Sequence, residues 1–514
     1  MISLSYILGI DIGTTGCKSA VFDTKGNTVF VSSEEYTTRK PTPEASEQDP
    51  NQWWKATQKT LRKVLDYNGF DTNELESIGI CGQMHSAALL DDNKQVIRPS
   101  ITWMDQRSSE EVESLKKDIG LEKLRSITGN FPTTTYTLPH LLWIRHNDPR
   151  SFEKISHVLT PKDFIKFKLT EVLNTEYSDA SGTFLMDYEE KEWSDQLLSY
   201  LGLSEDNMPP LTESTEIIGR VTSRAMEETG LPEGIPVVAG SADQTAGAIG
   251  MGAIKPNQVT SLIGTAGVVS ANTSRAKPDP DKKLMCWAHA VPGIWQNLGV
   301  MQTSGATLRW FRNNIDVNKI HPGENQASGY KEYNRRANEV PPGSKGMIFL
   351  PYLEGERTPH WNSQARGIFF GISTNHEKRH FIRAIMEGVG FSLKDSIDLI
   401  EDLGTEITKI RVTGGGYRSK VWRQIVADIT EKEIQYSNVQ EGSAFGVAVL
   451  SGVGTGIYSG FKEAIEQTTS IEAKTRPRED NFGVYRKLHE IYQKLYEQNK
   501  ELYDELGELK TVKK

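Results

Sequence analysis

The chain has 514 residues, more than the roughly 250–300 that one hydrophobic core usually serves, so we expect two or more large domains. Hydrophobic residues make up 37 % and charged residues 25 %, which is typical of a globular protein and excludes a disordered chain. The 59 Lys and Arg residues against 68 Asp and Glu give a formal net charge of −9, which argues against a nucleic-acid partner but permits a basic pocket for a phosphorylated ligand.

Three cysteines, Cys17, Cys81 and Cys286, lie far apart without a Cys-x-x-Cys pair. Neither a disulfide framework nor a thiolate zinc site is therefore expected. The first residues show no basic segment before their apolar run, and no apolar stretch approaches the roughly 20 residues that span a bilayer. We expect no signal peptide, no membrane partner and a cytoplasmic location.

The first forty residues predict three consecutive strands. Apolar runs occupy residues 6–10, 19–22 and 28–31. The Gly/Asn segment 23–27 predicts a hairpin turn between the second and third runs, and the Gly-Thr segment 13–16 joins the first two. This order differs from the strand–loop–helix order of dinucleotide-binding and P-loop folds.

Helices and strands alternate after this opening. Residues 51–65 predict a helix that follows Asp49-Pro50, and residues 77–81 and 237–240 predict buried strands. The class that results is α/β with mixed sheets. From about residue 482, apolar residues at helical spacing predict a long amphipathic helix that caps the second half rather than binding a partner.

An approximate internal repeat indicates a duplicated pair of domains. Residues 13–16 and 264–267 both have the sequence Gly-Thr-x-Gly, and each lies between two apolar strands. The second copy is flanked by strands predicted at 259–263 and 268–271. One match could be chance, but its position near the start of each half favours duplication. We expect domains at 1–252 and 253–514.

Gly-Thr turns between strands expose backbone N–H groups that bind phosphate oxygens. Thr14 and Thr15 add hydroxyl donors, and Lys18 adds a positive charge. A single copy would more simply be a plain hairpin turn, but the repeat and the neighbouring Asp11 favour phosphate binding. Asp11 ends an apolar strand, where its carboxylate could hold Mg²⁺ directly or through water; a turn-forming Asp is the alternative.

Two other segments could carry chemistry. Gly414-Gly415-Gly416 follows a strand predicted at 410–413 and precedes a helix predicted at 419–430, so a flat ligand such as adenosine could approach the backbone, although a plain turn would also need glycine. Asp243 follows a buried strand among small residues and could accept a proton from an attacking hydroxyl. The alternative is an N-cap for a helix that begins at Gln244.

Polar and aromatic residues near two predicted strand ends could recognise a sugar. Gln83, Met84 and His85 follow the strand at 77–81, and residues 103–107 combine a Trp with an acid and a base. Structural roles for these residues are the alternative. The sequence has no Gly-Lys dipeptide of a Walker A loop and no H-R-D or D-F-G set of a protein kinase.

Together these motifs resemble the FGGY carbohydrate kinases. Residues 9–15 are similar to the family's first phosphate loop, and residues 367–372 with 380–387 are similar to its C-terminal signature. The resemblance runs from about Ile7 to Gly454. It implies two duplicated ribonuclease-H-like domains of the actin-like ATPase type, with mixed sheets flanked by helices and a cleft between the domains.

Within the family, the xylulokinase branch is the most similar, through residues 46–50, 82–85, 178–183 and 350–360. This implies transfer of the γ-phosphoryl group of ATP to a ketopentose, D-xylulose first, with Asp243 as general base and Asp11 associated with Mg²⁺. The implied sugar contacts are Gln83, Met84, His85, Trp103, Asp105, Asp243 and Gln244. The implied ATP contacts are Thr14, Thr15, Lys18, Gly264, Thr265, Gly305, Arg309, Gly414, Gly415 and Ser419.

The chain departs from the family's usual pattern near the expected sugar pocket. His140 replaces a Lys, Ser86 replaces the Gly of most xylulokinases, and residues 102–107 differ from the commoner Trp-Asn-Asp pattern. Because gluconate-type members also carry Ser, a kinase for gluconate or another polyol or ketose is an alternative. An actin- or chaperone-like ATPase without a sugar substrate is an alternative of another class. The resemblance makes a homodimer plausible.

Overall fold

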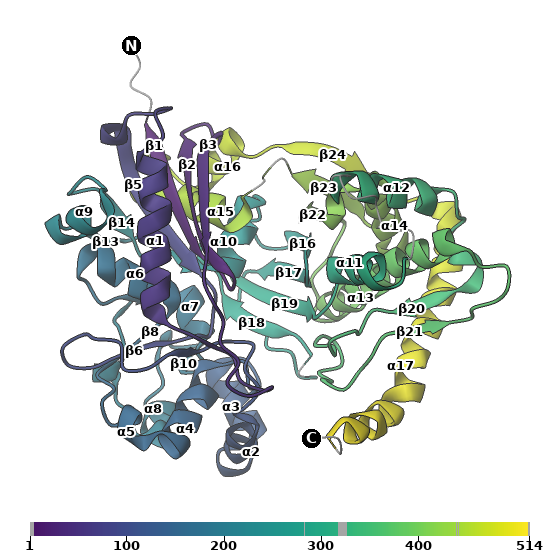
Figure 1. Ribbon diagram of the computed structural model, residues 1–514, viewed down its shortest axis with the longest axis horizontal. Helices are drawn as coiled ribbons and strands as arrows, with labels where there is room; N and C mark the ends of the chain where they lie inside the picture. Colours follow the sequence, from purple (N-terminus) through teal and green to yellow (C-terminus); the bar gives the residue numbers. More distant parts are fainter. Residues whose placement is uncertain (1–4, 282, 317–325, 438, 440, 512–514) are drawn as a thin grey trace.

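The computed structural model describes residues 5–281, 283–316, 326–437, 439 and 441–511. Two halves lie side by side, and each is built around a seven-stranded mixed sheet with helices on its faces (Figure 1). The N-terminal half contains most of the first 250 residues together with a segment from residues 442–468, and most of the remainder forms the half on the right. This arrangement confirms the α/β class with two sheet-containing domains.

The first sheet has the strand order β13-β14-β5-β1-β2-β3, with β15 also paired to β5. The first three strands in the sequence pair antiparallel, whereas β5 runs parallel to β1. The three opening strands and their hairpin are thus confirmed. The bounds are β1 Tyr6–Ile12, β2 Gly16–Asp23, β3 Thr28–Glu35, β5 Leu75–Gly82, β13 Ile217–Arg220, β14 Pro236–Val238 and β15 Ser241–Ala242.

The second sheet repeats this plan with the order β18-β19-β17-β16-β22-β23-β24. Its strands β16, β17 and β19 are antiparallel neighbours, and β22 and β23 then run parallel to β16, as β5 and β14 do beside β1. The shared topology confirms the duplication inferred from the Gly-Thr repeat. The bounds are β16 Val259–Ile263, β17 Gly267–Thr273, β18 Met285–Ala288, β19 Trp295–Met301, β22 Lys409–Thr413, β23 Glu433–Ser437 and β24 Ile471–Thr475.

Side chains of β1 alternate between two cores, as the period of two in a strand requires. Leu8 and Ile10 join the core beneath the helices α1 (Pro50–Leu65) and α6 (Pro161–Thr170). Ile7 points to the opposite face, where the helix α15 (Gly442–Gly454) packs. The first strand is therefore covered on both sides, which explains why its sequence is almost wholly apolar.

The helix α15 comes from late in the chain, yet it lies on the first sheet. A Cβ atom at Gly9 of β1 would lie 2.0 Å from the carbonyl oxygen of Ala444. A Cβ at Gly446 would lie 1.8 Å from the carbonyl oxygen of Ala246, in the helix α10 (Asp243–Gly250). Only glycine allows such backbone contact. The two halves are therefore joined by paired helices, and the division of the chain at residue 252 stays a prediction.

Helices of the remaining segments complete both halves. Between β5 and β13 lie α2 Ser109–Asp118, α3 Leu121–Thr128, α4 Thr137–Asn147, α5 Pro149–Phe152, α7 Tyr177–Ser181 and α8 Asp195–Leu201, and α9 Ser223–Thr229 follows β13. The second half contains α11 Gly305–Asn314, α12 Gln326–Asn338, α13 Lys378–Asp402, α14 Lys420–Thr430 and α17 Phe482–Thr511, whereas α16 Phe461–Thr468 packs with α15 on the first sheet.

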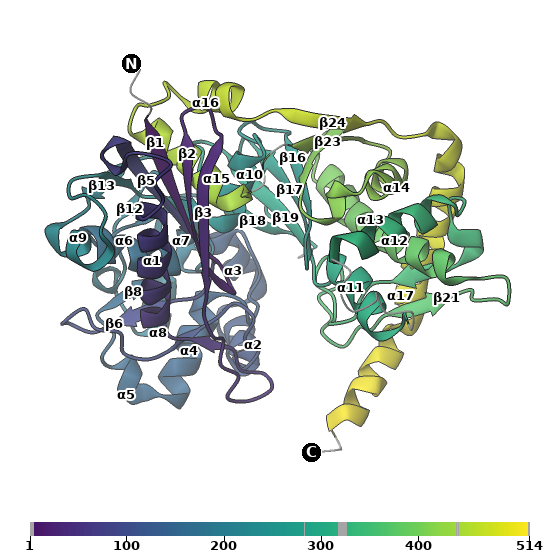
Figure 2. The same ribbon diagram turned by 45° about the horizontal axis from the view of Figure 1, so that its top comes forward.

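The predicted C-terminal amphipathic helix is α17. Tyr485 and Tyr492 are buried in the second core, whereas Leu502 and Leu506 are 55 % and 44 % exposed. The last turns of α17 extend beyond the body of the domain (Figures 1 and 2). The apolar spacing thus predicts the helix correctly, and its packing against the domain reaches Tyr503, which is buried. No helix among the described residues is both long and apolar enough to cross a membrane.

Candidate active site

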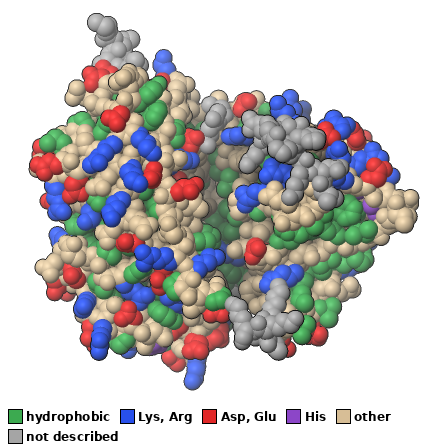
Figure 3. Space-filling model, viewed as in Figure 1, with side chains coloured by type: hydrophobic (Ala, Val, Ile, Leu, Met, Phe, Trp, Pro, Cys, Tyr) green, Lys and Arg blue, Asp and Glu red, His purple; other side chains and the backbone are tan. Residues whose placement is uncertain are grey.

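Two carboxylates meet at one edge of the first sheet. Strands β1 and β15 both run parallel to β5, and Asp11 and Ser241 are both paired with Cys81 of β5. Asp243 begins α10 directly after β15. Since the carboxyl ends of parallel strands share an edge, Asp11 and Asp243 flank the end of β5. The surface between the two halves of the molecule is hollowed (Figure 3).

The electrostatic field at this edge is strongly negative. The pKa of Asp243 is raised to about 8, chiefly by burial and also by the nearby charges of Asp11 and Asp179, while hydrogen bonds from Gln244 oppose the rise. Burial likewise raises the pKa of Asp11 to about 6, although the positive charge of Lys18 opposes this. Perturbed carboxyl groups of this kind are typical of proton-transfer sites.

Asp11 has a free acceptor position. Its Oδ1 is buried and has no hydrogen-bond partner within the part of the chain that the structure describes. The same part contains no group of three His, Cys, Asp or Glu side chains arranged to hold a metal ion. Mg²⁺ usually keeps several waters and binds one or two carboxylates plus phosphate oxygens, so a lone carboxylate fits this ion. Its role as a metal ligand stays a prediction.

The first Gly-Thr loop contacts Trp103, one of the predicted sugar-binding residues. Its Thr14 hydroxyl accepts a hydrogen bond from the indole N–H of Trp103 at 3.1 Å, and the Thr15 carbonyl accepts from the backbone of Tyr36. Lys18 forms an ion pair of 2.7 Å with Glu441, which immediately precedes α15. The loop is therefore held by neighbours from both halves.

The second Gly-Thr loop is held against the start of α11. The backbone N–H groups of Ser304 and Gly305 donate to the carbonyls of Thr265 and Gly264, both at 2.8 Å. A Cβ at Gly305 would lie 2.4 Å from the Gly264 carbonyl oxygen, so this contact requires glycine. Arg309, one turn later in α11, is exposed. The first backbone N–H groups of α11 are therefore engaged by this loop, and phosphate binding by the loop stays a prediction.

The glycine-rich segment lies at the same edge as the second loop, because β22 and β16 are parallel neighbours. Gly414 has a φ of +98°, which favours glycine, and a Cβ at Gly415 would meet no heavy atom within 4 Å. Open space at Gly415 permits a ligand to approach the backbone. Ser419 is the N-cap of α14 rather than its first residue, and its hydroxyl donates to Asn334 at 2.8 Å.

The Gln83–His85 segment leaves β5 beside Asp11. The amide of Gln83 donates to Gln48 at 2.9 Å, while its Oε1 is buried without a partner among the described residues. Met84 is buried, and His85 has a φ of +71°, with Nδ1 2.5 Å from the Gly182 carbonyl oxygen. Burial lowers the pKa of His85 to about 3, so its ring is neutral at pH 7.

Arg357 is a candidate that the motif analysis did not single out. It belongs to the second half, yet its guanidinium lies over the Trp103 ring of the first half, 4.9 Å from the centroid. Burial lowers its pKa to about 10, while the positive charge of Arg357 lowers the pKa of His85. In the sequence, residues 350–360 show only a similarity to the xylulokinase branch of the family. No local pattern shows that an Arg from there reaches Trp103.

Asp105 is occupied by protein partners. It is fully buried, and its carboxylate accepts the backbone N–H of Ser46 at 2.6 Å and pairs with Arg107 at 2.8 Å. Arg107 also pairs with Glu47 at 2.8 Å. These contacts shape the loop that holds Trp103. A direct contact between Asp105 and a sugar stays a prediction.

The two single-residue departures are both buried. His140 Nε2 lies 2.7 Å from the Thr134 carbonyl oxygen, and burial lowers the pKa of His140 to about 4. A neutral imidazole therefore stands where the family usually has a Lys. Ser86 is fully buried, and its hydroxyl has no partner among the described residues. Both changes alter the polarity near His85 and Asp105.

A buried ionic cluster beneath Asp243 also escaped the sequence analysis. Lys162 is completely buried, and its Nζ lies 2.6 Å from Asp163, 3.3 Å from Asp179 and 3.5 Å from Glu176. The stretch 160–166 resembles an ordinary charged helix start. The one sequence feature that could have indicated the cluster is the family similarity at residues 178–183, but that similarity assigns no role to Asp179.

This cluster is connected to Asp243 by hydrogen bonds. Glu176 accepts both the backbone N–H of Ser178 at 2.7 Å and its hydroxyl at 2.9 Å. The Ser178 oxygen in turn accepts the backbone N–H of Ala242 at 3.0 Å, one residue before Asp243. Lys162, Glu176 and Ser178 therefore act as positioning residues for the first turn of α10.

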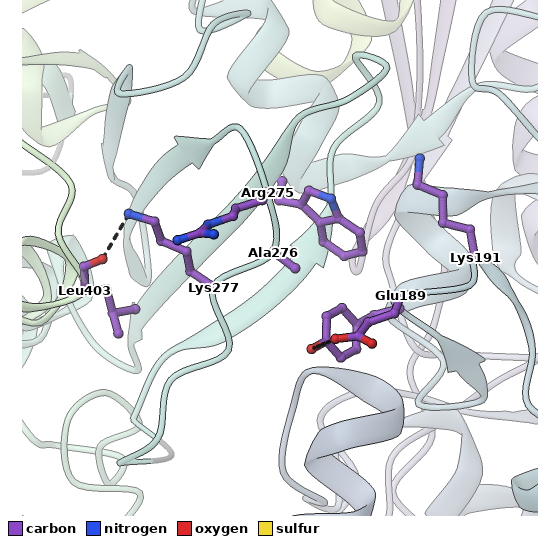
Figure 4. Close-up of a pocket in the computed structure, with 8 residues that line it drawn as sticks. Glu189, Lys191, Arg275, Ala276, Lys277 and Leu403 are labelled. Carbon is purple, nitrogen blue, oxygen red and sulfur yellow. Dashed lines mark hydrogen bonds between the residues drawn. The ribbon is translucent and has the colours of Figure 1, made fainter.

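One cavity between the halves lies away from these residues. It has a volume of about 640 Å³ and is lined by Tyr188, Glu189, Lys191, Arg275, Ala276, Lys277, Trp295 and Leu403 (Figure 4). Lys277 donates to the Leu403 carbonyl at 2.9 Å, so part of its donor capacity is engaged. None of the predicted site residues lines this cavity.

Comparison with known proteins decides the family. The family model for the FGGY family of carbohydrate kinases, N-terminal domain, matches residues 6–250, and the model for the C-terminal domain matches residues 259–455. The chain belongs to the FGGY family of carbohydrate kinases. It is accordingly a carbohydrate kinase, a phosphotransferase, and its two domains have the actin-like ATPase fold.

Relatives of this FGGY kinase include proteins with two different names. A xylulose kinase from Escherichia coli is 34 % identical over 484 residues, covering 94 % of this chain and 97 % of that protein. A gluconokinase from Bacillus subtilis is 30 % identical over 489 residues, covering 95 % and 94 %. The crystal structure of a xylulose kinase from Rhodospirillum rubrum is 28 % identical with a TM-score of 0.88, covering 97 % of this chain and 100 % of that one.

Proposed function

We propose that this kinase transfers the γ-phosphoryl group of ATP to the 5-hydroxyl of D-xylulose. The observation that carries the proposal is the Asp243 carboxylate with its raised pKa, at the edge where the first Gly-Thr loop also begins. The relatives named xylulose kinase support the choice of sugar.

In the proposed mechanism, Asp243 accepts the proton of the sugar hydroxyl as the oxygen attacks the γ-phosphorus. Negative charge then spreads over the phosphoryl oxygens, where the N–H groups of both Gly-Thr loops and the side chain of Lys18 stabilise it. Gln83, Met84, His85, Trp103 and Gln244 would orient the sugar. Positioning and electrostatics supply most of the catalysis in phosphoryl transfer, and these residues provide both.

ATP would contact the loops at Thr14, Thr15, Gly264 and Thr265, with Gly305, Arg309, Gly414, Gly415 and Ser419 around the nucleoside and its phosphates. Asp11 would hold Mg²⁺, which when bound neutralises phosphate charge. The unpartnered Oδ1 of Asp11 and the mutual repulsion of Asp11 and Asp243 both favour a cation there.

A substrate panel tests the proposal. Mg²⁺-dependent ADP release would be measured with D-xylulose, L-xylulose, D- and L-ribulose, gluconate, glycerol and erythritol. We expect the highest kcat/KM with D-xylulose. Preference for another acceptor would contradict the sugar assignment and make His140 and Ser86 candidate specificity residues. ADP release that no sugar stimulates would instead support an ATPase.

Gluconate is the second candidate acceptor, and one observation favours it. The positive charge of Arg357 lies over Trp103 and close to His85, and no side-chain carboxylate pairs with it among the described residues. An arginine in such a place could bind the carboxylate of gluconate. The gluconokinase relative and the buried Ser86 are consistent with this reading.

Replacing Arg357 by Ala is expected to raise the KM for the preferred acceptor about tenfold or more, because a charge-assisted contact and the packing on Trp103 are lost. The KM for ATP should change less than twofold. Steady-state kinetics with each substrate varied in turn would measure both. Arg366→Lys, on the same segment, is the control and should leave both constants unchanged. Equal effects on both KM values would contradict a sugar-side role.

The pH dependence follows from the raised pKa of Asp243. A general base must be unprotonated, and this carboxyl has a pKa of about 8 without ligands. At limiting sugar and saturating MgATP, kcat/KM should rise about tenfold per pH unit between pH 6 and pH 7, reach half its maximum near pH 8 and level off above about pH 9. A cation bound at Asp11 would move the midpoint below 8. A profile that is flat over this range would contradict the assignment of Asp243 as the base.

A homodimer and a cytoplasmic location are also proposed. Light scattering at several protein concentrations would test the first, and fractionation of the source cells would test the second.

A further inference from the structure

The C-terminal half contains a second hollow, far from the carboxylate pair. It is a groove of about 780 Å³ along α14, between the end of α12 and the end of β24. Neither Gly415 nor Ser419 lines it, although Lys420, which follows Ser419, does. Its polar lining comes mainly from basic side chains.

Six basic residues line this groove: Arg383, Lys420, Arg423, Lys474, Arg476 and Arg478. Lys474 is paired in register with Gln435, next to the Tyr436 that Arg423 covers, so the side chains of Lys474 and, two residues later, Arg476 lie on the face away from α14. Arg383 is neutralised by Glu387 at 2.7 Å, and Arg476 has a distant partner in Glu433 at 3.8 Å. The other four have no ion-pair partner among the described residues. Such a concentration of positive charge is unfavourable without an anion, particularly in a chain with a net charge of −9.

The two acids that line the groove are already engaged. Asp428 accepts hydrogen bonds from Gln424, from the backbone N–H of Arg478 and from Asn481, at 2.7 to 2.8 Å. Glu339 pairs with Arg335, which lies outside the groove. Neither acid therefore neutralises the unpaired cations through a direct ion pair.

Arg423 provides a built, buried part of the groove. It is only 5 % exposed, its Nη1 donates to the Tyr417 carbonyl at 2.6 Å, and its guanidinium lies over the ring of Tyr436. Its Nε has no partner among the described residues. A buried guanidinium with a spare donor is costly unless a ligand or water completes its hydrogen bonds.

We propose that this groove binds a small molecule through its phosphoryl group. Arg423 would supply a fixed donor from the groove wall, while Lys420 and Arg478 would close over the anion. Arginine and lysine side chains that converge from several elements are the usual phosphate ligands in proteins. The chemistry is shared by inorganic phosphate, a sugar phosphate and a nucleotide.

Calorimetric titration with inorganic phosphate, D-ribose 5-phosphate and AMP tests the proposal. The protein would be saturated with Mg²⁺ and a non-hydrolysable ATP analogue, so that the active-site phosphate positions are filled. We expect at least one probe to bind with a Kd below about 10 mM. Lys420→Gln and Arg478→Gln should each weaken that binding about tenfold, because each removes a charge-assisted hydrogen bond. The three probes distinguish free phosphate from the sugar and nucleoside forms.

Lys462→Gln is the matched control, since Lys462 lies in α16 and outside the groove. Arg423 itself is not substituted, because it also holds the Tyr417 carbonyl. A second readout is acetylation by N-hydroxysuccinimide acetate, followed by mass spectrometry. Bound probe should protect Lys420 severalfold and leave Lys474 and Lys462 unprotected. No binding, or binding that both groove variants retain in full, would overturn the proposal, as would equal acetylation of all three lysines.

Discussion

Asp243→Asn is expected to lower kcat by at least about a hundredfold and, at the same time, to make the protein more stable at alkaline pH. The kinetic loss follows because an amide cannot accept the hydroxyl proton, and general-base catalysis contributes roughly 10²–10⁴-fold. The stabilisation follows because the carboxylate is buried near Asp11 and Asp179, and both repel its charged form. The side chain changes little in size.

The direction with pH can be worked out from the pKa. The folded protein raises the pKa of Asp243 from 3.8 to about 8, so the folded state binds a proton that the unfolded chain releases. This contribution to stability is fully present below about pH 4 and is lost as the pH rises towards 8. The Asn variant has no such loss. Its Tm should exceed that of the wild type by about 1–3 °C at pH 8.5 and by less than about 1 °C at pH 5.

Asp195→Asn is a suitable control, because Asp195 is also the first residue of a helix but is exposed. Its activity and Tm should match those of the wild type. Calorimetry with an ATP analogue would show whether the Asp243 variant keeps its nucleotide site. Near-normal turnover in Asp243→Asn would reject the base assignment. A fall in Tm at pH 8.5 would reject the repulsion that we infer among the three acids.

Much of the fold follows from patterns that are local in the sequence. The strand β16 has the bounds that its apolar run predicts, and Asp49-Pro50 marks the beginning of α1. The duplication could be predicted because both Gly-Thr turns keep the same place between strands. The preference of Asp for the N-cap position does not predict the start of α10 correctly. Ala242 is the N-cap and Asp243 is the first residue of the helix, so Asp243 is not the N-cap that one interpretation suggested.

The remaining features depend on contacts between distant segments. Gly9 and Gly446 are 437 positions apart, and only the folded chain shows that both allow close backbone packing around α15. Arg357 reaches Trp103 from the other half of the molecule. Site roles for Asp11, Asp243 and the phosphate loops can be predicted from the sequence, because a strand end and a glycine turn are each recognisable from a few consecutive residues. Their catalytic roles stay predictions.

Lys162→Met is expected to destabilise the protein by about 3–5 kcal/mol at pH 8, the cost of breaking a buried ion pair by removing one partner. Lys162 is fully buried among Asp163, Glu176 and Asp179. Without it, the cation that remains in ion-pair contact with these carboxylates, among the described residues, is Lys166, whose Nζ lies 2.9 Å from Asp163. Urea unfolding of the variant and the wild type would measure the difference.

The pH dependence of the unfolding free energy distinguishes the loss of the Lys162 charge from a loss of side-chain packing. Burial already raises the pKa of Asp179 to about 7, and the charge of Lys162 opposes that rise. Removing the lysine raises the pKa further, so a proton binds the folded variant more tightly than the unfolded chain. The loss of unfolding free energy should therefore shrink as the pH falls from 8 to 6. A loss of packing would be the same at both values.

The control comes from the same helix. Lys168 is half-buried and lies over the ring of Phe164 without an ion pair among the described residues, so Lys168→Met should cost less than about 1 kcal/mol. Because Glu176 and Ser178 hold the backbone just before Asp243, Lys162→Met should also lower kcat more than it raises either KM. If the variant is as stable as the wild type at pH 8, the acids are not held in place by Lys162, and the first turn of α10 must be positioned without it, by the hydrogen bonds of Glu176 and Ser178 and the packing of α15.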